Sequence, residues 1–169
     1  MISPLVECIP NFSEGRRPEV IEEIRNEIAA VSGVYVLNTH MDGDHNRSVI
    51  TFIGSPAGVE EAAFRMIAKA AELIDMESHS GEHPRLGATD VVPFVPISDM
   101  SMDECIAMAH RLGERVGKEL DIPVYFYEQA ALRPERKRLE NVRRGEYEAV
   151  KNQISKVPER APDQGPKKV

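Results

Sequence analysis

The chain has 169 residues, of which 41% are hydrophobic, and its formal net charge is −7 at pH 7. This length and apolar content predict a globular protein whose core is large enough to fold without a disulfide framework. The negative charge disfavours a general nucleic-acid-binding surface, so the expected ligand is a small molecule.

Two features of the sequence bear on location. It contains no apolar run of about 18 residues, and residues 1–10 lack the basic start and long apolar core of a secretory signal. We therefore expect a cytoplasmic protein with no membrane partner. Cys8 and Cys105 form no C-x-x-C pair, and both are expected to be small buried residues.

Strand and helix patterns alternate in the first third of the chain. Residues 5–10 form a short apolar strand candidate, and Pro18 then opens a helix whose apolar residues recur at helical spacing. Residues 34–38 and 48–53 are β-branched strand candidates. The polar loop HMDGDHNR, at residues 40–47, joins them and predicts a β-hairpin with a long tip.

The pattern continues with a second helix and a fourth strand. Pro56 opens an amphipathic helix that extends to Ile74, and residues 90–97 supply the strand. Pro93 and Pro96 predict that this strand lies at an edge or is irregular. The order βαββαβ predicts an α+β fold of the ferredoxin-like type, in which an antiparallel or mixed sheet carries its helices on one face.

An αβ extension is expected after this unit. Ser101 and Glu104 form a capping box that opens a third helix, and residues 124–127 form a short strand candidate after it. The composition then becomes charged and rich in proline. The predicted division is a folded unit over residues 1–158 and a linker or tail over residues 159–169.

The segment SGEHPRLGATD, at residues 80–90, carries the strongest sign of chemistry. Gly81 and Gly87 allow tight backbone geometry, and Pro84 fixes one dihedral angle. His83 lies between them, and histidine is the side chain that most readily exchanges a proton near neutral pH. A stiff loop that holds such a group suggests catalysis. The alternative is that His83 is an ordinary loop residue.

The hairpin tip and the segment before the fourth strand are expected to converge at one end of the sheet. The first loop offers His40, Asp42, Asp44, His45, Asn46 and Arg47, and the second offers His79, Glu82, His83 and Arg85. Together they supply acids, bases and guanidinium groups for one site.

This combination permits two chemistries. The donors of His40, Asp42, Asp44 and His45 suit zinc or a similar divalent ion, which would indicate a metal-dependent hydrolase. Hairpin tips are also rich in Asp and Gly because turns favour these residues. Proton transfer by His83 beside arginines that hold a carboxylate needs no metal, and we favour this second chemistry without a metal site.

Four long segments carry a family resemblance. They are VECIPNFSEGR at 6–16, DHNRSVITFIG at 44–54, LIDMESHSGEHPRLGATDVVPFVPI at 73–97 and ELDIPVYFYEQAA at 119–131. In this order they resemble the N-terminal subdomain of glutamate formiminotransferase, the domain also found in formiminotransferase-cyclodeaminase. The resemblance spans almost the whole chain.

The resemblance implies a folate-dependent transferase of one-carbon metabolism. Such an enzyme moves the formimino group from N-formimino-L-glutamate to tetrahydrofolate, its co-substrate, in histidine degradation. His83 falls on the family's catalytic histidine. Folate N5 would attack the amidine carbon, and one histidine acting as general acid and base could move the proton from N5 to the departing glutamate nitrogen.

The expected substrate- and folate-binding residues are Asn11, Ser13, His40, Asn46, Arg47, Glu82, Arg85, Asp163, Gln164 and Gly165. Arg47 and Arg85 suit the carboxylates of glutamate or of the folate tail, whereas Asn11, Ser13 and Asn46 suit the pterin or the amidine. Each has a structural alternative: the arginines could pair with a nearby Asp, and the other three could cap or stabilise turns. Glu82 could tune His83 or remain a solvated carboxylate.

The chain departs from the family's pattern in three ways. The family binds folate between two similar subdomains, whereas this chain resembles only the first. The linker motif PDFGP corresponds to residues 162–166, where Gln164 replaces the aromatic residue, and some members have Asp in place of His40. We therefore expect a second subdomain, a partner chain or assembly into a homo-oligomer. The remaining alternative is a non-catalytic half-module that needs a partner chain.

Overall fold

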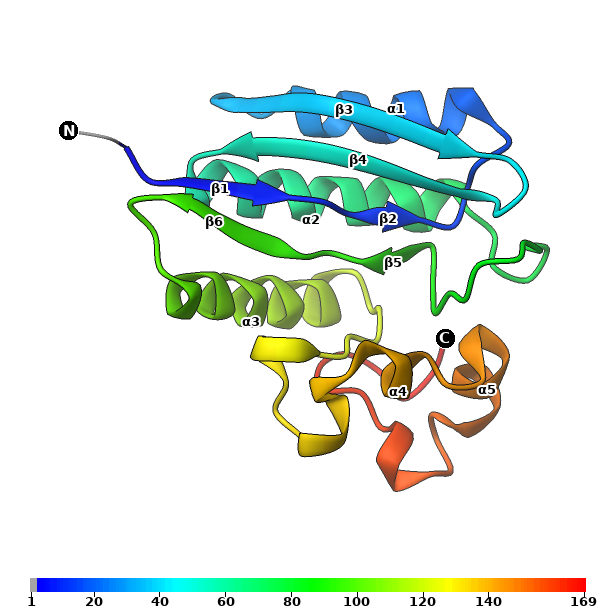
Figure 1. Ribbon diagram of the computed structural model, residues 1–169. Helices are drawn as coiled ribbons and strands as arrows, with labels where there is room; N and C mark the ends of the chain where they lie inside the picture. The colour runs from blue at the N-terminus through cyan, green and yellow to red at the C-terminus, as the bar shows by residue number, and fades with distance from the viewer. Residues whose placement is uncertain (1–2) are drawn as a thin grey trace. The chain divides into compact units, whose positions relative to one another are not determined.

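The computed structural model describes residues 3–169 (Figure 1), and the chain separates into two compact units, the first ending at Cys105 and the second covering Ile106–Val169. The elements of the first unit are β1 (Leu5–Cys8), β2 (Asn11–Phe12), α1 (Pro18–Ala29), β3 (Val34–Asp42), β4 (Arg47–Gly54), α2 (Pro56–Leu73), β5 (Thr89–Val91) and β6 (Phe94–Ser98). Helix α3 (Met102–Glu119) spans the boundary between the units.

The strands form one sheet in which every pairing is antiparallel. Strand β4 pairs with β3 on one side and with both β1 and β2 on the other. Strand β6 pairs with β1, and β5 pairs with β2. The predicted α+β class is therefore confirmed, with a sheet that is antiparallel throughout its described pairings.

Helices α1 and α2 lie on the same side of the sheet (Figure 1). Their buried residues recur at helical spacing: Val20, Ile21, Ile24 and Ile28 in α1, and Val59, Ala62, Ala63, Met66, Ile67 and Ala70 in α2. In β4 the alternate residues Ile50 and Phe52 are fully buried. The periods of 3.6 and 2 thus place the apolar faces of helix and strand in one core.

Prolines limit two of the predicted strands. The first, predicted over residues 5–10, ends at Cys8 as β1, and the separate strand β2 follows Pro10; the fourth divides into β5 and β6 around Pro93. A proline has no N–H group to donate to a strand ladder. The irregularity predicted for the fourth strand is therefore confirmed, whereas the first strand was predicted two residues too long.

The hairpin tip is shorter than the sequence predicts. Strand β3 continues to Asp42 and β4 begins at Arg47, and these two residues face each other in the ladder. The tip is therefore residues 43–46. Asn46 closes it with a φ of 49°, in the left-handed region that Asn tolerates better than most residues. His40, expected in the loop, is a strand residue that faces Val49.

Helix α3 begins as predicted. The Ser101 N–H donates to the Glu104 carboxylate at 2.7 Å, and the Glu104 N–H donates to Ser101 Oγ at 3.2 Å. This reciprocal pair is a capping box, which satisfies donors at a helix start that would otherwise lack partners.

The second unit contains short helices after α3. They are η1 (Glu128–Ala130), η2 (Pro134–Lys137), α4 (Leu139–Arg143), α5 (Glu146–Gln153) and η3 (Pro158–Arg160). The strand expected at 124–127 is wrong, because only a single bridge joins Val124 to Gln164. Pro162 and Pro166 lie on either side of Gln164 and lack the N–H groups that a longer ladder requires. The proposed division at residue 158 stays a prediction.

None of the helices among the described residues combines the length and the apolar character needed to cross a membrane.

Candidate functional site

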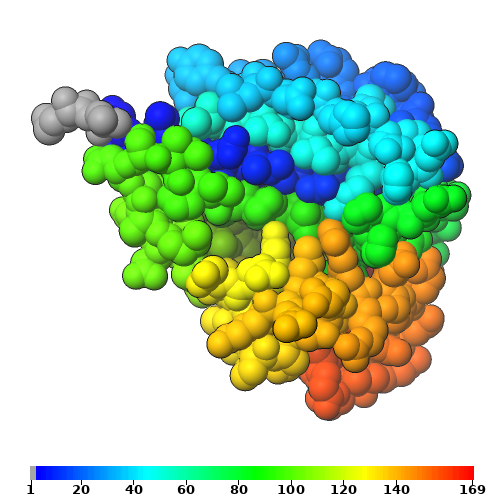
Figure 2. Space-filling model, viewed as in Figure 1, coloured from blue at the N-terminus to red at the C-terminus, as the bar shows by residue number. Residues whose placement is uncertain are grey.

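The two polar loops of the first unit meet, as the sequence predicts. The hairpin tip and the segment between α2 and β5 form adjoining cyan and green surfaces (Figure 2). Asn46 Nδ2 donates to the carbonyl oxygen of Ser80 at 3.0 Å. The rings of His45 and His83 lie edge to face, with their centroids 6.3 Å apart. Residues from two distant parts of the chain therefore share one end of the sheet.

His83 has its ring fixed by a backbone group. Its Nδ1 lies 2.7 Å from the carbonyl oxygen of Pro84. A carbonyl oxygen can only accept, so Nδ1 carries a proton and, in the neutral ring, Nε2 carries the lone pair. No hydrogen bond among residues 3–169 reaches this Nε2 atom, and the residue is partly exposed. The ring is thus prepared to accept a proton from a bound molecule.

Arg47 is anchored beneath this loop. Its side chain is 9% exposed and forms an ion pair at 2.8 Å with Asp90, whose side chain is fully buried. Arg47 Nε donates to Asn11 Oδ1 at 2.9 Å, and Nη1 donates to the Pro84 carbonyl oxygen at 3.4 Å. The other Asp90 oxygen accepts from the Leu86 N–H at 2.7 Å. Arg47 and Asp90 therefore connect β4 to the middle and the C-terminal end of the His83 loop.

Asp90 is a site residue that the sequence reasoning missed. It lies 43 residues from Arg47, and nothing in the spacing of the two indicates that they pair. The available signal was an acidic residue directly after the glycine-rich loop, at the start of a predicted strand.

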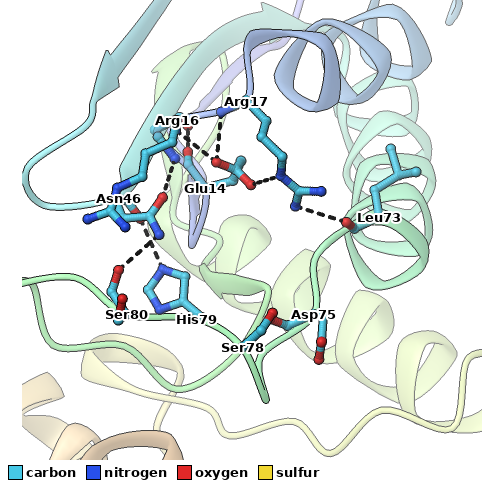
Figure 3. Close-up of polar contacts among 11 residues, drawn as sticks. Glu14, Arg16, Arg17, Asn46, Leu73, Asp75, Ser78, His79 and Ser80 are labelled. Carbon is cyan, nitrogen blue, oxygen red and sulfur yellow. Dashed lines mark hydrogen bonds and ion pairs between the residues drawn. The ribbon is translucent and has the colours of Figure 1, made fainter.

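Arg85 and His79 form a second anchor. Arg85 is 6% exposed and donates from Nε to His79 Nδ1 at 3.1 Å. Since Nδ1 accepts, the proton of His79 is on Nε2, which lies 3.1 Å from the carbonyl oxygen of Asn46. Figure 3 shows His79 and Ser80 directed at Asn46. His79 therefore bridges the two loops through both of its ring nitrogens.

Three predicted binding residues make backbone contacts in the site. Asn11 Nδ2 donates to the Ile9 carbonyl oxygen at 3.2 Å, and Ser13 Oγ donates to that of Gly87 at 2.8 Å. Asn46 Oδ1 accepts from the Gly15 N–H at 2.9 Å. Neither Asn11 nor Ser13 caps helix α1, whose N-cap Arg17 has no side-chain cap hydrogen bond, and Asn46 joins the hairpin tip to Gly15 and Ser80.

The chain before α1 is held by a buried carboxylate. Glu14 is 5% exposed and accepts from the N–H groups of Arg16 and Arg17 at 2.8 and 2.9 Å, as well as from Arg17 Nε at 2.6 Å (Figure 3). Burial raises the pKa of Glu14, but these hydrogen bonds outweigh it and the pKa is lowered. Glu14 also accepts a hydrogen bond on its carbonyl oxygen from Ser48 Oγ.

Asp42 and His45 form a pair within the hairpin tip. Asp42 Oδ2 lies 2.8 Å from His45 Nδ1, and Asp42 Oδ1 accepts from the N–H groups of Asp44 and His45, each at 3.0 Å. The backbone and ring hydrogen bonds from His45 lower the pKa of Asp42. The sequence named Asp42 and His45 among the polar groups of the site and as possible metal ligands, but did not indicate that they pair with each other.

The remaining predicted residues of the first unit lie apart from these networks. His40 is exposed on β3, and no hydrogen bond among residues 3–169 joins it to the other candidates. Glu82 is exposed beside His83, whose Nδ1 partner is instead the Pro84 carbonyl oxygen.

No group of three or more His, Cys, Asp or Glu side chains within residues 3–169 converges as metal ligands would. The geometry of the tip therefore gives no support to the metal-dependent hydrolase.

The last three predicted residues belong to the second unit. The Asp163 carboxylate accepts from the Phe126 N–H at 2.8 Å and forms an ion pair with the buried Arg136 at 2.7 Å. The Gln164 carbonyl oxygen accepts from the Val124 N–H at 2.9 Å. Gly165 has a φ of 82°, and a Cβ there would lie 2.2 Å from the Ile122 carbonyl oxygen. The PDQGP segment is therefore a defined turn.

Comparison of the sequence with known proteins identifies the family to which the chain is similar. The family described as "Formiminotransferase domain, N-terminal subdomain" matches residues 5–169. The chain is 51% identical over 164 residues to "Glutamate formimidoyltransferase" of Thermoplasma acidophilum, covering 96% of this chain and 54% of that protein. It is 44% identical over 168 residues to the protein of the same name from Streptococcus pyogenes serotype M1, covering 99% and 56%.

A longer relative is also matched over only part of its length. The chain is 47% identical over 165 residues to "Formimidoyltransferase-cyclodeaminase" of Gallus gallus, covering 98% of this chain and 30% of that protein. The chain spans about half the length of the two shorter relatives and 30% of the length of this one. Because the family match covers nearly the whole sequence, the chain belongs to the formiminotransferase family and corresponds to its N-terminal subdomain.

Proposed function

We propose that this chain acts in a glutamate formiminotransferase, a folate-dependent transferase in histidine degradation. The formimino group would pass from N-formimino-L-glutamate to tetrahydrofolate, the co-substrate. The observation that carries the proposal is the state of His83, whose Nδ1 donates to Pro84 at 2.7 Å and leaves Nε2 available to a substrate. The names of relatives at 44% and 51% identity support the reaction.

In the proposed mechanism, His83 is a general base and then a general acid. Its Nε2 accepts the proton that leaves the attacking folate N5 as the new bond to the amidine carbon forms. It then gives a proton to the glutamate nitrogen as the bond between that nitrogen and the carbon breaks. Such proton transfer contributes about 100- to 10,000-fold to a rate.

The two arginines have a supporting role in this proposal. Arg47 is paired with Asp90, and Arg85 donates to His79, so both guanidinium groups already bind the protein. Arg85 would contribute positive potential that attracts the glutamate or folate carboxylates, and Arg47 would orient the loop. Asn11, Ser13 and Asn46 would shape the pterin and amidine region through the turns they hold, with His40 and Glu82 at its exposed rim.

The second unit would contribute to folate binding through Asp163, Gln164 and Gly165. Its support is the defined PDQGP turn, in which Asp163 is fixed by Arg136 and Gly165 is required by its positive φ. Gln164 would replace aromatic stacking on the pterin with hydrogen bonds from its amide.

We also propose the ferredoxin-like arrangement for the first unit. The order βαββαβ supports it if β1 and β2 count as one interrupted strand and β5 and β6 as another. The antiparallel neighbours of β4 and the placement of α1 and α2 on one side of the sheet also agree with this arrangement (Figure 1).

The complete activity would need more than this chain. Relatives about twice as long support a requirement for a second formiminotransferase subdomain or a partner chain, and assembly into a homo-oligomer would provide further contacts. The net charge of −7 supports small-molecule substrates rather than nucleic acid, and we propose the cytoplasm as the location.

Glutamate release tests the proposal. The chain, together with its second subdomain where that is supplied separately, should release glutamate from N-formimino-L-glutamate only when tetrahydrofolate is present. His83→Ala should abolish release, whereas Ser80→Ala, in the same loop, should leave it unchanged because Ser80 contributes only its carbonyl oxygen. Retained turnover in His83→Ala, or release without folate, would refute the proposed function.

A further inference from the structure

A second imidazole lies beside His83 and is held by a carboxylate. Asp42 Oδ2 lies 2.8 Å from His45 Nδ1, within the hairpin tip. The other oxygen of Asp42 accepts two backbone N–H groups, which fix the carboxylate against the turn. Those hydrogen bonds, with the one from the ring, hold the pKa of Asp42 below its usual value of 3.8. Asp42 is therefore an ionised acceptor at neutral pH, and His45 Nδ1 is the donor.

The two histidines have the same orientation relative to their partners. His45 donates from Nδ1 to a carboxylate, and His83 donates from Nδ1 to a carbonyl oxygen. In the part of the chain that the structure describes, neither Nε2 atom has a hydrogen-bond partner within the protein. Each Nε2 is therefore available for a hydrogen bond to a molecule from outside the protein.

The rings are close enough to act on one substrate. Their centroids are 6.3 Å apart and their planes meet at 70°. A general acid or base must come within about 2.6–3.2 Å of the atom that it serves, or act through one water molecule. A centroid separation of 6.3 Å is compatible with two rings that each serve one of two nitrogens bonded to the same carbon. The side chains of His45 and Asp42 are 48% and 39% exposed, so a ligand can approach them.

The partners of the two rings differ in charge. The carboxylate of Asp42 can compensate the positive charge on His45 while that ring carries a second proton, as in the carboxylate–imidazole pairs of acid–base enzymes. His83 has a neutral carbonyl partner, which it shares with the Arg47 guanidinium. The two rings therefore differ in the charge of the group that accepts their Nδ1 proton.

We infer that His45, oriented by Asp42, is a second catalytic proton-transfer group that acts as the general acid opposite His83. The inference rests on the proposed formimino transfer and changes its last step. His83 would serve the attacking nitrogen, and His45 would serve the departing one. A single ring would then not need to reach both nitrogens in turn.

The protons and electron pairs balance in this scheme. The lone pair of folate N5 forms the new bond to the amidine carbon, and the N5 proton passes to His83 Nε2. The bond between that carbon and the glutamate nitrogen then breaks, its electron pair stays on nitrogen, and protonated His45 supplies a proton from Nε2. His83 finishes with one more proton and His45 with one fewer. Transfer between the two rings, directly or through water, restores the starting state.

A change of donor tests the inference. N-formimino-L-glutamate releases a basic nitrogen that needs an acid, whereas phenyl formimidate releases phenolate, which leaves without a proton. His45→Gln should lower kcat about 100-fold or more with the first donor and have little effect with the second. His83→Gln should be inactive with both donors, because the attacking nitrogen must still lose its proton. Asp44→Asn, which removes a neighbouring carboxylate with no part in this scheme, is the matched control.

The outcomes separate the two proposals. If the wild-type protein transfers no formimino group from either donor, the proposed function fails. If the wild type is active and His45→Gln matches it with N-formimino-L-glutamate, the inference fails but the function stands. If His45→Gln loses the same factor with both donors, His45 has only a structural role and the inference also fails.

A second measurement does not require turnover. Long-range ¹H–¹⁵N spectra of the histidine rings should show that neutral His45 and His83 both carry their proton on Nδ1. In Asp42→Asn, the preference for this tautomer should weaken in His45 and remain in His83. A His45 ring protonated on Nε2 in the neutral wild-type protein would overturn the inference.

Discussion

Arg47 and His83 donate hydrogen bonds to the same oxygen atom, the carbonyl oxygen of Pro84, at 3.4 and 2.7 Å. Arg47 is itself fixed by the buried carboxylate of Asp90. The orientation of the proposed catalytic ring is therefore connected, through one peptide group, to an ion pair inside the protein. The buried Arg47–Asp90 pair therefore helps to fix the position of His83, which lies on a surface loop.

Removing the carboxylate of this ion pair should be costly. In Asp90→Ala, Arg47 stays buried without its charged partner, and loss of one member of a buried pair costs about 3–5 kcal/mol. Urea unfolding would measure the change in the free energy of unfolding. Glu22→Ala removes an exposed partner of Arg25 on α1 and should change stability by less than about 1 kcal/mol. Equal effects of the two substitutions would contradict the role given to Asp90.

Gly15 should not tolerate a side chain, whereas Gly43 should. A Cβ on Gly15 would lie 2.1 Å from the Asp42 carbonyl oxygen and 2.5 Å from the Arg47 nitrogen, both of which are backbone atoms. Gly15→Ala should therefore destabilise the protein by about 1–3 kcal/mol, as overpacking does. At Gly43 the nearest atom lies at 3.7 Å, so Gly43→Ala should be close to neutral in thermal or urea unfolding.

Glu14 should make stability depend on pH in the acid range. Burial raises its pKa, but hydrogen bonds from Arg16 and Arg17 lower it below the usual 4.5. A carboxylate with a lowered folded-state pKa stabilises the protein fully above pH 4.5, and this contribution is lost as the pH falls through the folded pKa. The difference in unfolding free energy between wild type and Glu14→Gln should therefore be largest at neutral pH and shrink as the pH falls below 4.5. A constant difference would contradict the hydrogen-bond assignment.

Tyr125 should have the opposite effect in the alkaline range. Burial raises its pKa to about 12, against smaller opposing effects from Arg136 and Arg160. Its hydroxyl donates to the Arg160 carbonyl oxygen at 2.6 Å. The stability that this neutral hydroxyl contributes should be complete below pH 10 and lost as the pH rises through about 12. Ultraviolet titration should show one phenol ionising near pH 12, and Tyr125→Phe should remove that step.

The sequence by itself determined the elements whose signals are local. Apolar residues at helical spacing predicted α1 and α2, and the reciprocal polar residues Ser101 and Glu104 predicted the start of α3. Two β-branched segments joined by a polar loop predicted the hairpin of β3 and β4, and the prolines predicted the irregular fourth strand. Each signal lies within a few residues of the structure that it controls, so a single sequence can show it.

The sequence also indicated which loops would meet, but not which hydrogen bonds their atoms would form. Strand order alone predicted that the hairpin tip and the His83 loop share one end of the sheet, and contacts such as that between Asn46 and Ser80 bear this out. The length of the tip and the strand expected at residues 124–127 were wrong in the sequence prediction. Both depend on which partner each backbone group finds in the folded chain.

Only the tertiary structure decided the chemistry of each polar side chain. In a neutral histidine, the hydrogen bond made by one ring nitrogen determines whether the other nitrogen can accept a proton. In His83, Nδ1 donates to the Pro84 carbonyl oxygen, so Nε2 is the nitrogen that can accept. Arg47 is a buried anchor because Asp90, 43 residues away, lies at 2.8 Å. Composition and spacing name the groups present, whereas hydrogen bonding and burial, which act over a few ångströms in space, assign the proton and the charge.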